Sequence, residues 1–160
     1  MIIAVDPSYT KNIGISWLDQ KGIHFNSIVL DKADKDLDTR DLQHIAFKVF
    51  SFICGLNPQM NSILAVEGQF FGVNKIMTMR LIEVRALLQG MVIAKYPSMK
   101  VVTVNPISWQ SKVLNAYKIK SEEIKKLSIK YASDLTGKKV TEDESDAICI
   151  LKYIEKNGNK

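Results

Sequence analysis

The chain opens with Met1-Ile-Ile-Ala-Val-Asp-Pro7, an apolar run that ends in an acid followed by proline. Its residues 2–5 predict a short buried strand. The pattern returns at Ile63-Leu-Ala-Val-Glu67, a second apolar strand closed by an acid. An acid at the end of a buried strand costs free energy unless something binds it. The two runs therefore predict two buried strands, and the acids at their ends are candidates for binding a ligand.

The other segments predict helices around that sheet. Further strands are expected at 13–18, 23–30 and 101–104, with a hairpin turn at 19–22. Apolar residues at helical spacing predict helices at 39–54, 74–95, 107–114 and 121–135. Three meandering strands followed by strands that alternate with helices indicate an α/β fold, a mixed five-stranded sheet flanked by helices.

Two more acids precede the apolar C-terminal segment Ala147-Ile-Cys-Ile-Leu151. Thr141 and Glu144 have the spacing of a capping box, so a helix is expected to begin there. This start places Asp143 in the first helical turn and Asp146 three residues later, on the same face. Asp146 is the harder acid to explain as a solvent-facing residue, because it adjoins the buried run.

Each acid also has an ordinary explanation when it is considered alone. Asp6 could initiate a turn before Pro7, Glu67 could face solvent, and Asp143 could complement the helix N-terminus. Several acids meeting in one place would repel each other strongly without cations. Oxygen ligands favour Mg²⁺ or Mn²⁺, and two such ions can clamp a phosphodiester for attack by water. Jointly the acids therefore predict a two-metal site.

Composition indicates an ordinary globular protein. The chain has 160 residues, of which 46% are hydrophobic and 24% charged, and we expect one domain over 1–156 with a frayed end at 157–160. No apolar run approaches the ~20 residues of a membrane helix, and no signal peptide is evident, so a cytoplasmic location is expected. Cys54 and Cys149 are far apart without a Cys/His cluster, which argues against zinc and disulfides; Cys149 is expected in the core.

Positive charge is concentrated in one segment. Between Lys112 and Lys139 eight lysines face three acids, a surplus of +5 that equals the net charge of the whole chain. A solvated helix face would explain this surplus equally well. Basic residues combined with clustered acids are more specific, since they suit a polyanion whose backbone approaches bound metal.

Three motifs together resemble those of RuvC-type Holliday junction resolvases. They are Ile2-Ile-Ala-Val-Asp6-Pro-Ser, Val66-Glu67-Gly-Gln-Phe70-Phe-Gly-Val-Asn74 and Asp143-Glu-Ser-Asp146-Ala. The resemblance spans nearly the whole chain, and the small size fits a phage-encoded member acting in the cytoplasm of a bacterial host. It implies a ribonuclease-H-like fold with the first strand beside the fourth, a homodimer, and Mg²⁺ or Mn²⁺. It further implies that Asp6, Glu67, Asp143 and Asp146 are the metal-binding catalytic residues.

The resemblance also suggests residues that bind DNA. Phe70 stands where the family places an aromatic that stacks on a junction base, with Phe71 as the second choice; a buried aromatic under the next helix is the rival interpretation. Base stacking is worth ~1–3 kcal/mol per base. Asn74 matches an Asn of the same motif, although it could simply cap the following helix. The remaining expected DNA contacts are Lys75, Lys112, Lys118, Lys120 and Lys125.

The chain departs from the bacterial pattern after its fifth expected strand. Asn105-Pro-Ile-Ser-Trp-Gln-Ser-Lys112 replaces a glycine-rich, lysine-bearing segment of the bacterial site. Lys120 is a better equivalent of the active-site lysine than Lys112, although Lys118 is a further candidate. Trp109 is expected in the core rather than against DNA. The divergence makes action on forks and flaps, besides four-way junctions, plausible.

The helix expected at 74–95 is apolar around much of its circumference, and we expect its surplus apolar surface to form a homodimer. Two active sites would suit a two-fold symmetric junction. The alternative is that the helix has a broad apolar face that packs entirely in the core of the single chain. Two rival functions stay open at this point: a ribonuclease-H-like nuclease acting on structured RNA, and a non-catalytic protein that binds junctions.

Overall fold

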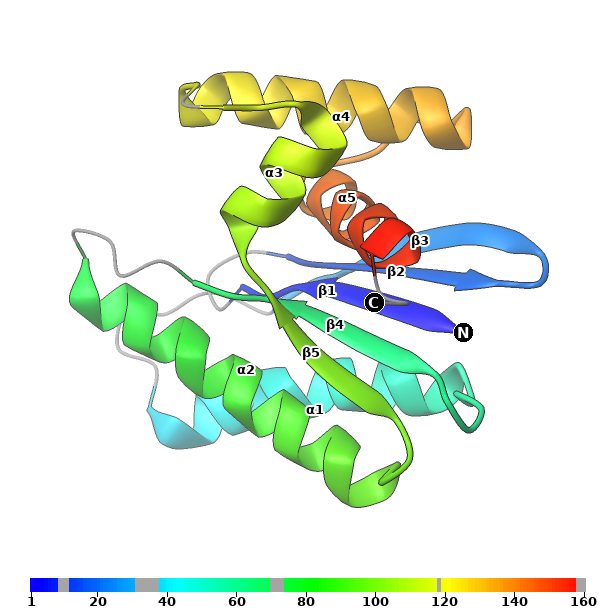
Figure 1. Ribbon diagram of the computed structural model, residues 1–160. Coiled ribbons are helices and arrows are strands. Elements are labelled where there is room, and N and C mark those ends of the chain that lie inside the picture. Colours follow the sequence, from blue (N-terminus) through cyan, green and yellow to red (C-terminus); the bar gives the residue numbers. More distant parts are fainter. Residues whose placement is uncertain (9–11, 31–37, 70–73, 118, 158–160) are drawn as a thin grey trace.

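Five strands form one mixed sheet in the order β3-β2-β1-β4-β5 (Figure 1). A computed structural model describes all residues except 9–11, 31–37, 70–73, 118 and 158–160. The strands are β1 (Ile2–Asp6), β2 (Ile13–Asp19), β3 (Gly22–Ile28), β4 (Ile63–Glu67) and β5 (Lys100–Val104). β1 pairs antiparallel with β2 and parallel with β4. The two apolar runs that end in acids are thus adjacent parallel strands, as expected.

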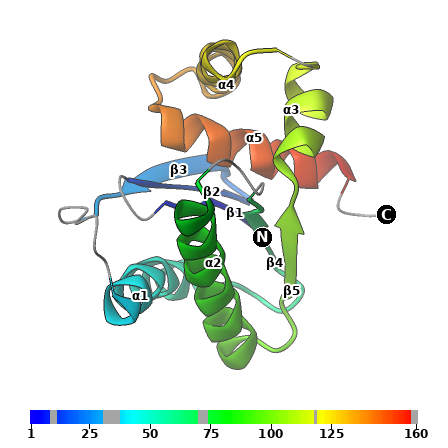
Figure 2. The same ribbon diagram turned by 90° about the vertical axis from the view of Figure 1, so that its left-hand side faces the viewer.

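The helices cover both faces of the sheet. They are α1 (Thr39–Gly55), α2 (Lys75–Lys95), α3 (Pro106–Leu114), α4 (Ser121–Thr136) and α5 (Glu142–Asn157). α1 and α2 lie on one face and α3, α4 and α5 on the other (Figures 1 and 2). The lysine-rich segment therefore lies across the sheet from the long apolar helix α2.

Local signals explain where most helices begin. Asp38 and Asp41 form a capping box at the start of α1, and Thr141 and Glu144 exchange the two hydrogen bonds of the predicted box. Gly137 ends α4 in a left-handed conformation, with φ of 66°. Small boundary errors remain in the predictions: the third strand ends at Ile28 rather than Leu30.

Two apolar clusters fill the space on either side of the sheet. One joins α1 and α2 to the sheet through residues such as Ile53 and Leu88. The other joins α3 and α5 to it and contains Trp109 and Cys149. Cys149 is fully buried, which confirms its predicted place in the core. Asn157 is the last residue of α5, and its side-chain amide donates to the Tyr153 carbonyl; the rest of the predicted frayed end lies outside the described residues.

None of the helices in the described parts of the chain is long and apolar enough to cross a lipid bilayer.

Candidate metal-binding active site

Three of the four predicted acids meet where β1, β4 and α5 converge. Asp6 and Glu67 follow the paired residues Val5 and Val66, so they end neighbouring parallel strands. A cavity of about 500 Å³ at this place is lined by Asp6, Glu67 and Asp146. The loop after β4, the first turns of α2, and α3 form the rest of its wall. The predicted convergence of acids from segments far apart in sequence is therefore present.

The acids of this cavity have raised pKa values, because they are partly buried and lie close to one another. Burial raises the pKa of Asp6 well above its ordinary value, and the charges of Glu67 and Asp146 raise it further. Burial likewise raises the pKa of Glu67, although hydrogen bonds with Trp109 and Asp6 partly offset the rise. Burial raises the pKa of Asp146 to about 7, against a smaller lowering by hydrogen bonding with Ser128. Protons or cations must neutralise such a group of carboxylates near neutral pH.

Asp143 takes a more peripheral position than the other acids. It lies in the first turn of α5, and its charge contributes to raising the pKa of both Asp6 and Asp146. The described lining of the cavity includes Asp146 but not Asp143. The neighbours Glu142 and Glu144 have other partners: Glu142 pairs with Lys125, and Glu144 completes the capping box.

Gly14 shapes the site by allowing two segments to approach closely, and this role was not predicted from the sequence. It pairs with Asp6 across β1 and β2, and a Cβ atom there would lie 1.9 Å from the carbonyl oxygen of Asp143. Only a residue without a side chain lets the first turn of α5 approach β2 this closely. The available signal was a glycine inside a strand, between Ile13 and Ile15, which often marks close backbone approach.

Trp109 is the second residue whose importance the sequence did not reveal. Its predicted place in the core is confirmed, since its side chain is only 1% exposed. Its indole Nε1–H also donates a hydrogen bond of 2.7 Å to Oε1 of Glu67. Spacing within α3 can predict that a tryptophan is buried, but it cannot predict which acceptor its N–H meets.

The loop after Glu67 is anchored on both sides as far as Gln69. The Gly68 amide donates to the Val104 carbonyl at 2.7 Å, and Arg85 of α2 donates to the Gln69 side chain at 3.2 Å. The predicted base-stacking residues Phe70 and Phe71 follow directly and lie outside the described residues. Their proposed role stays a prediction.

The donor set of the cavity fits a divalent cation in its chemistry. Asp146 has a buried carboxylate oxygen, Oδ1, without a hydrogen-bond partner among the described atoms. A cation would satisfy this oxygen and relieve the repulsion between the acids. Among the described side chains, no three of the types His, Cys, Asp and Glu are already arranged around one common position. Binding would thus require side-chain adjustment, including release of the hydrogen bond between Asp6 and Glu67.

The predicted DNA-binding lysines occupy different surroundings. Lys125 pairs with Glu142 at 2.6 Å, and this contact raises its pKa, with smaller contributions from Asp146 and Asp143. Lys120 is exposed at the start of α4 and makes no side-chain cap. The charge of Lys125 thus interacts with two of the predicted acids.

Of the other residues predicted to contact DNA, Asn74 lines the cavity, whereas Lys75 and Lys112 do not. Lys112 extends over the ring of Tyr153, with Nζ 5.7 Å from the ring centroid. Lys75 is exposed at the start of α2, and Lys118 lies outside the described residues. Asn74 lines the cavity and its Oδ1 accepts from the Met77 amide at 3.1 Å, so it does cap α2.

Solved structures of Holliday junction resolvases share this fold. Thermus thermophilus RuvC in complex with Holliday junction substrate matches with a TM-score of 0.68 and 15% identity over 98% of this chain and 95% of that chain. A second Thermus thermophilus RuvC structure gives 0.71 and 16% over 98% and 96%. The yeast mitochondrial Holliday junction resolvase Ydc2 gives 0.61 and 12% over 95% and 77%. No protein-family model and no curated protein sequence matches the chain.

At these identities the likeness concerns the fold. The chain has the ribonuclease-H-like mixed sheet that its sequence predicted, and the resemblance to RuvC-type resolvases is confirmed at this level.

Proposed function

We propose that this protein is a divalent-metal-dependent endonuclease that cuts Holliday junctions and other branched DNA, such as forks and flaps. The observation that carries the proposal is the meeting of the partly buried residues Asp6, Glu67 and Asp146 in one cavity. The fold supports it, because a RuvC bound to Holliday junction substrate has the same fold. The proposed cofactor is Mg²⁺ or Mn²⁺, with two ions per active site.

The chemistry of the proposed reaction follows from the acids. Two bound divalent cations would activate the attacking water and stabilise the 3′ oxygen that leaves the phosphodiester. Asp6, Glu67, Asp143 and Asp146 would hold these ions. The strand ends fix Asp6 and Glu67 relative to each other, and the first two turns of α5, which covers one face of the sheet, carry the aspartates (Figure 1). No histidine lines the described part of the cavity, so we assign no general-base role to one.

The same reasoning assigns a DNA-binding role to the basic side of the molecule. α4 carries the exposed Lys126 and Lys130 and the half-buried Lys125. It lies on the same face of the sheet as α5, whose first two turns bear two of the predicted acids (Figure 2). Lysine contacts to phosphates position a duplex without reading its sequence. We propose Lys125 as the lysine nearest to the scissile phosphate, because its charge interacts with Asp146. Lys75, Lys112 and Lys120 are proposed as contacts farther along the DNA.

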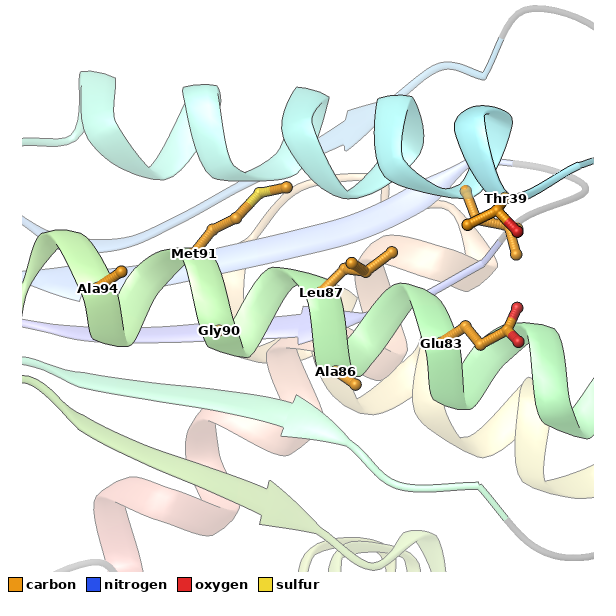
Figure 3. A pocket seen from close by; sticks show the side chains of 8 residues that line it. Thr39, Glu83, Ala86, Leu87, Gly90, Met91 and Ala94 are labelled. Atoms are coloured by element: carbon orange, nitrogen blue, oxygen red, sulfur yellow. The ribbon is translucent and has the colours of Figure 1, made fainter.

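We further propose that the protein acts as a homodimer through α1 and α2. A groove of about 670 Å³ runs between these helices, and Leu87 and Met91 extend from α2 toward α1 along it (Figure 3). On α2, Ile76, Met79 and Ile93 are exposed in the single chain. Ile76 and Met79 line a pocket that shares Thr39, Leu42 and Glu83 with this groove. Apolar surface of this kind is typical of an interface. A second copy would cover it and place two active sites on one junction.

Substrate and mechanism are tested together by offering one set of nucleic acids. The set contains a mobile four-way junction, a replication fork, a flap, a linear duplex and an RNA hairpin, each with Mg²⁺ and with EDTA. We expect metal-dependent cleavage of the branched DNA and little cleavage of the linear duplex. Preferred cleavage of the RNA hairpin would favour the rival ribonuclease. Junction binding without cleavage in any metal would favour the non-catalytic rival.

The matched variants for this experiment are Asp6→Asn and Asp146→Asn. Both are expected to bind the junction and fail to cut it. Asp134→Asn, which removes an exposed carboxylate of α4, should cut like the wild type. Wild-type cleavage by both active-site variants would refute the assigned roles.

A further inference from the structure

We infer that Trp109 is a positioning residue: the hydrogen bond from its indole N–H fixes one carboxylate oxygen of Glu67 and so restricts that side chain to conformations from which it can bind metal. The inference rests on the proposed function in one respect, since it assumes that Glu67 binds a divalent cation. It adds a residue outside the four predicted acids. It also gives a role to the segment in which the chain departs from the bacterial pattern.

The geometry of the contact is that of a strong hydrogen bond. The donor and acceptor atoms, Nε1 of Trp109 and Oε1 of Glu67, are 2.7 Å apart. An N–H group that donates to a carboxylate forms a charge-assisted bond, stronger than one between neutral groups. Trp109 is almost completely buried, so water does not compete well for its N–H. A rigid donor therefore fixes one oxygen of Glu67.

This hydrogen bond restricts the Glu67 side chain before a cation binds. Oε1 accepts from the indole. Glu67 also shares a hydrogen bond with Asp6, which a bound cation would replace, and it lines the same cavity as Asp6 and Asp146. A glutamate side chain has three rotatable bonds and loses conformational entropy when it binds an ion. The indole removes part of that cost before the ion arrives. Partners of this kind outside the ligand set orient metal ligands in many proteins.

The surroundings hold the indole itself in place. α3 begins directly after β5, where Asn105 Oδ1 accepts from the Ile107 amide at 2.9 Å and Pro106 occupies the first turn. Trp109 then packs in the cluster between α3, α5 and the sheet, beside residues such as Ala65 of β4. Because β4 ends in Glu67, donor and acceptor are anchored to the same cluster. The indole cannot turn away from Glu67 without disrupting the packing of this cluster.

The test replaces the N–H of Trp109 and leaves its shape unchanged. In a Trp17→Phe background, benzothienylalanine incorporated in place of tryptophan replaces the indole N–H at position 109 by sulfur. Mn²⁺ affinity is then measured by electron paramagnetic resonance of the free ion, with no DNA present. We expect the Mn²⁺ dissociation constant to rise about 10-fold, the low end of the effect of such partners. Thermal melting without metal should still show one cooperative transition, at a lower temperature than in the Trp17→Phe protein because the Glu67 carboxylate loses a donor.

Two further variants separate positioning from packing. Trp109→Phe should weaken Mn²⁺ binding at least as much as the sulfur isostere, because it also lacks the donor. Val113→Ala removes apolar volume from the same cluster at a residue that does not line the cavity. We expect it to lower the melting temperature but change Mn²⁺ affinity less than twofold. An unchanged Mn²⁺ affinity of the folded isostere protein would overturn the inference.

The outcome for Trp109 can be distinguished from the outcome for the proposed function. A wild-type protein that binds Mn²⁺ but cuts no branched DNA would refute the proposed function, and the comparison of affinities would still decide the role of Trp109. A wild-type protein that cuts junctions, combined with an isostere protein of unchanged Mn²⁺ affinity, would refute the role of Trp109 alone.

Discussion

Replacing Gly14 by alanine should slow cleavage by the proposed nuclease about 100-fold, although no acid is changed. The backbone of Gly14 does not adopt a positive φ, so the substitution is not strained by backbone conformation. The obstacle is space. The new methyl carbon would lie 1.9 Å from the carbonyl oxygen of Asp143, 2.4 Å from its carbonyl carbon and 3.2 Å from the Glu144 nitrogen.

The size of the effect follows from these distances. A Cβ atom essentially never approaches another atom closer than 3.0 Å, so the first turn of α5 must move away from β2 by at least about 1.1 Å, the difference from 1.9 Å. This turn carries Asp143, and Asp146 follows within one further turn. A misplacement of about 1 Å can cost about 100-fold in rate. Overpacking of this kind also costs about 1–3 kcal/mol in stability.

The assay is single-turnover cleavage of a four-way junction at saturating Mg²⁺, at a temperature where each variant is folded. We expect Gly14→Ala to cut about 100-fold more slowly, with a melting temperature lower by a few degrees, since about 1 kcal/mol shifts it by about 2–4 °C. Gly55→Ala is the matched control, because a Cβ atom there meets nothing within 4 Å. A folded Gly14→Ala protein that cuts at the wild-type rate would show that α5 does not position the acids in this way.

Three further predictions concern the acids and the proposed dimer. The stability of the metal-free protein should fall as pH rises from about 4 to about 7, and Mg²⁺ should restore it. The pKa of Asp146 is ordinarily 3.8 but about 7 in the folded protein, so in this pH range the folded state binds more protons than the unfolded state. A melting temperature that stays constant or rises with pH over this range would contradict this. Asp146→Asn should remove that charge and raise the metal-free melting temperature at pH 8 by about 4–8 °C, for an assumed gain of about 2 kcal/mol, while Asp134→Asn leaves it unchanged. Ala94→Glu places a charge in the groove between α1 and α2 and should give a monomer in sedimentation equilibrium. The wild type and the control variant Leu135→Glu on α4 should be dimers under the same conditions. A monomeric wild type would refute the dimer.

The central part of the fold could be predicted from the sequence because its signals are local. The runs Ile2–Val5 and Ile63–Val66 are apolar at every position, which is typical of strands buried on both faces. Pairing such strands in the middle of the sheet brings Asp6 and Glu67 together, and the structure has this pairing. The capping box at Thr141 likewise identified the start of the last helix correctly.

The contacts that shape the site are not local, and the sequence could not supply them. What a glycine makes room for depends on which segment approaches it, and Asp143 lies at the other end of the chain from Gly14. The partner of the Trp109 N–H depends on how α3 packs against the end of β4. Phe70 and Phe71 stay predictions, since they lie outside the described residues.

The docking of α5 on β2 has a consequence during protein synthesis. The buried hydroxyl of Ser16 donates to the Ala147 carbonyl at 2.8 Å, a contact between residues 131 positions apart. A ribosome-bound chain that has formed β1, β2 and β4 therefore presents two of the proposed metal ligands, while the other two are not yet translated. Cutting activity would begin only after α5 has left the ribosome and packed on the sheet. A nascent chain, or one interrupted before α5, would be harmless to the DNA of the cell that makes it.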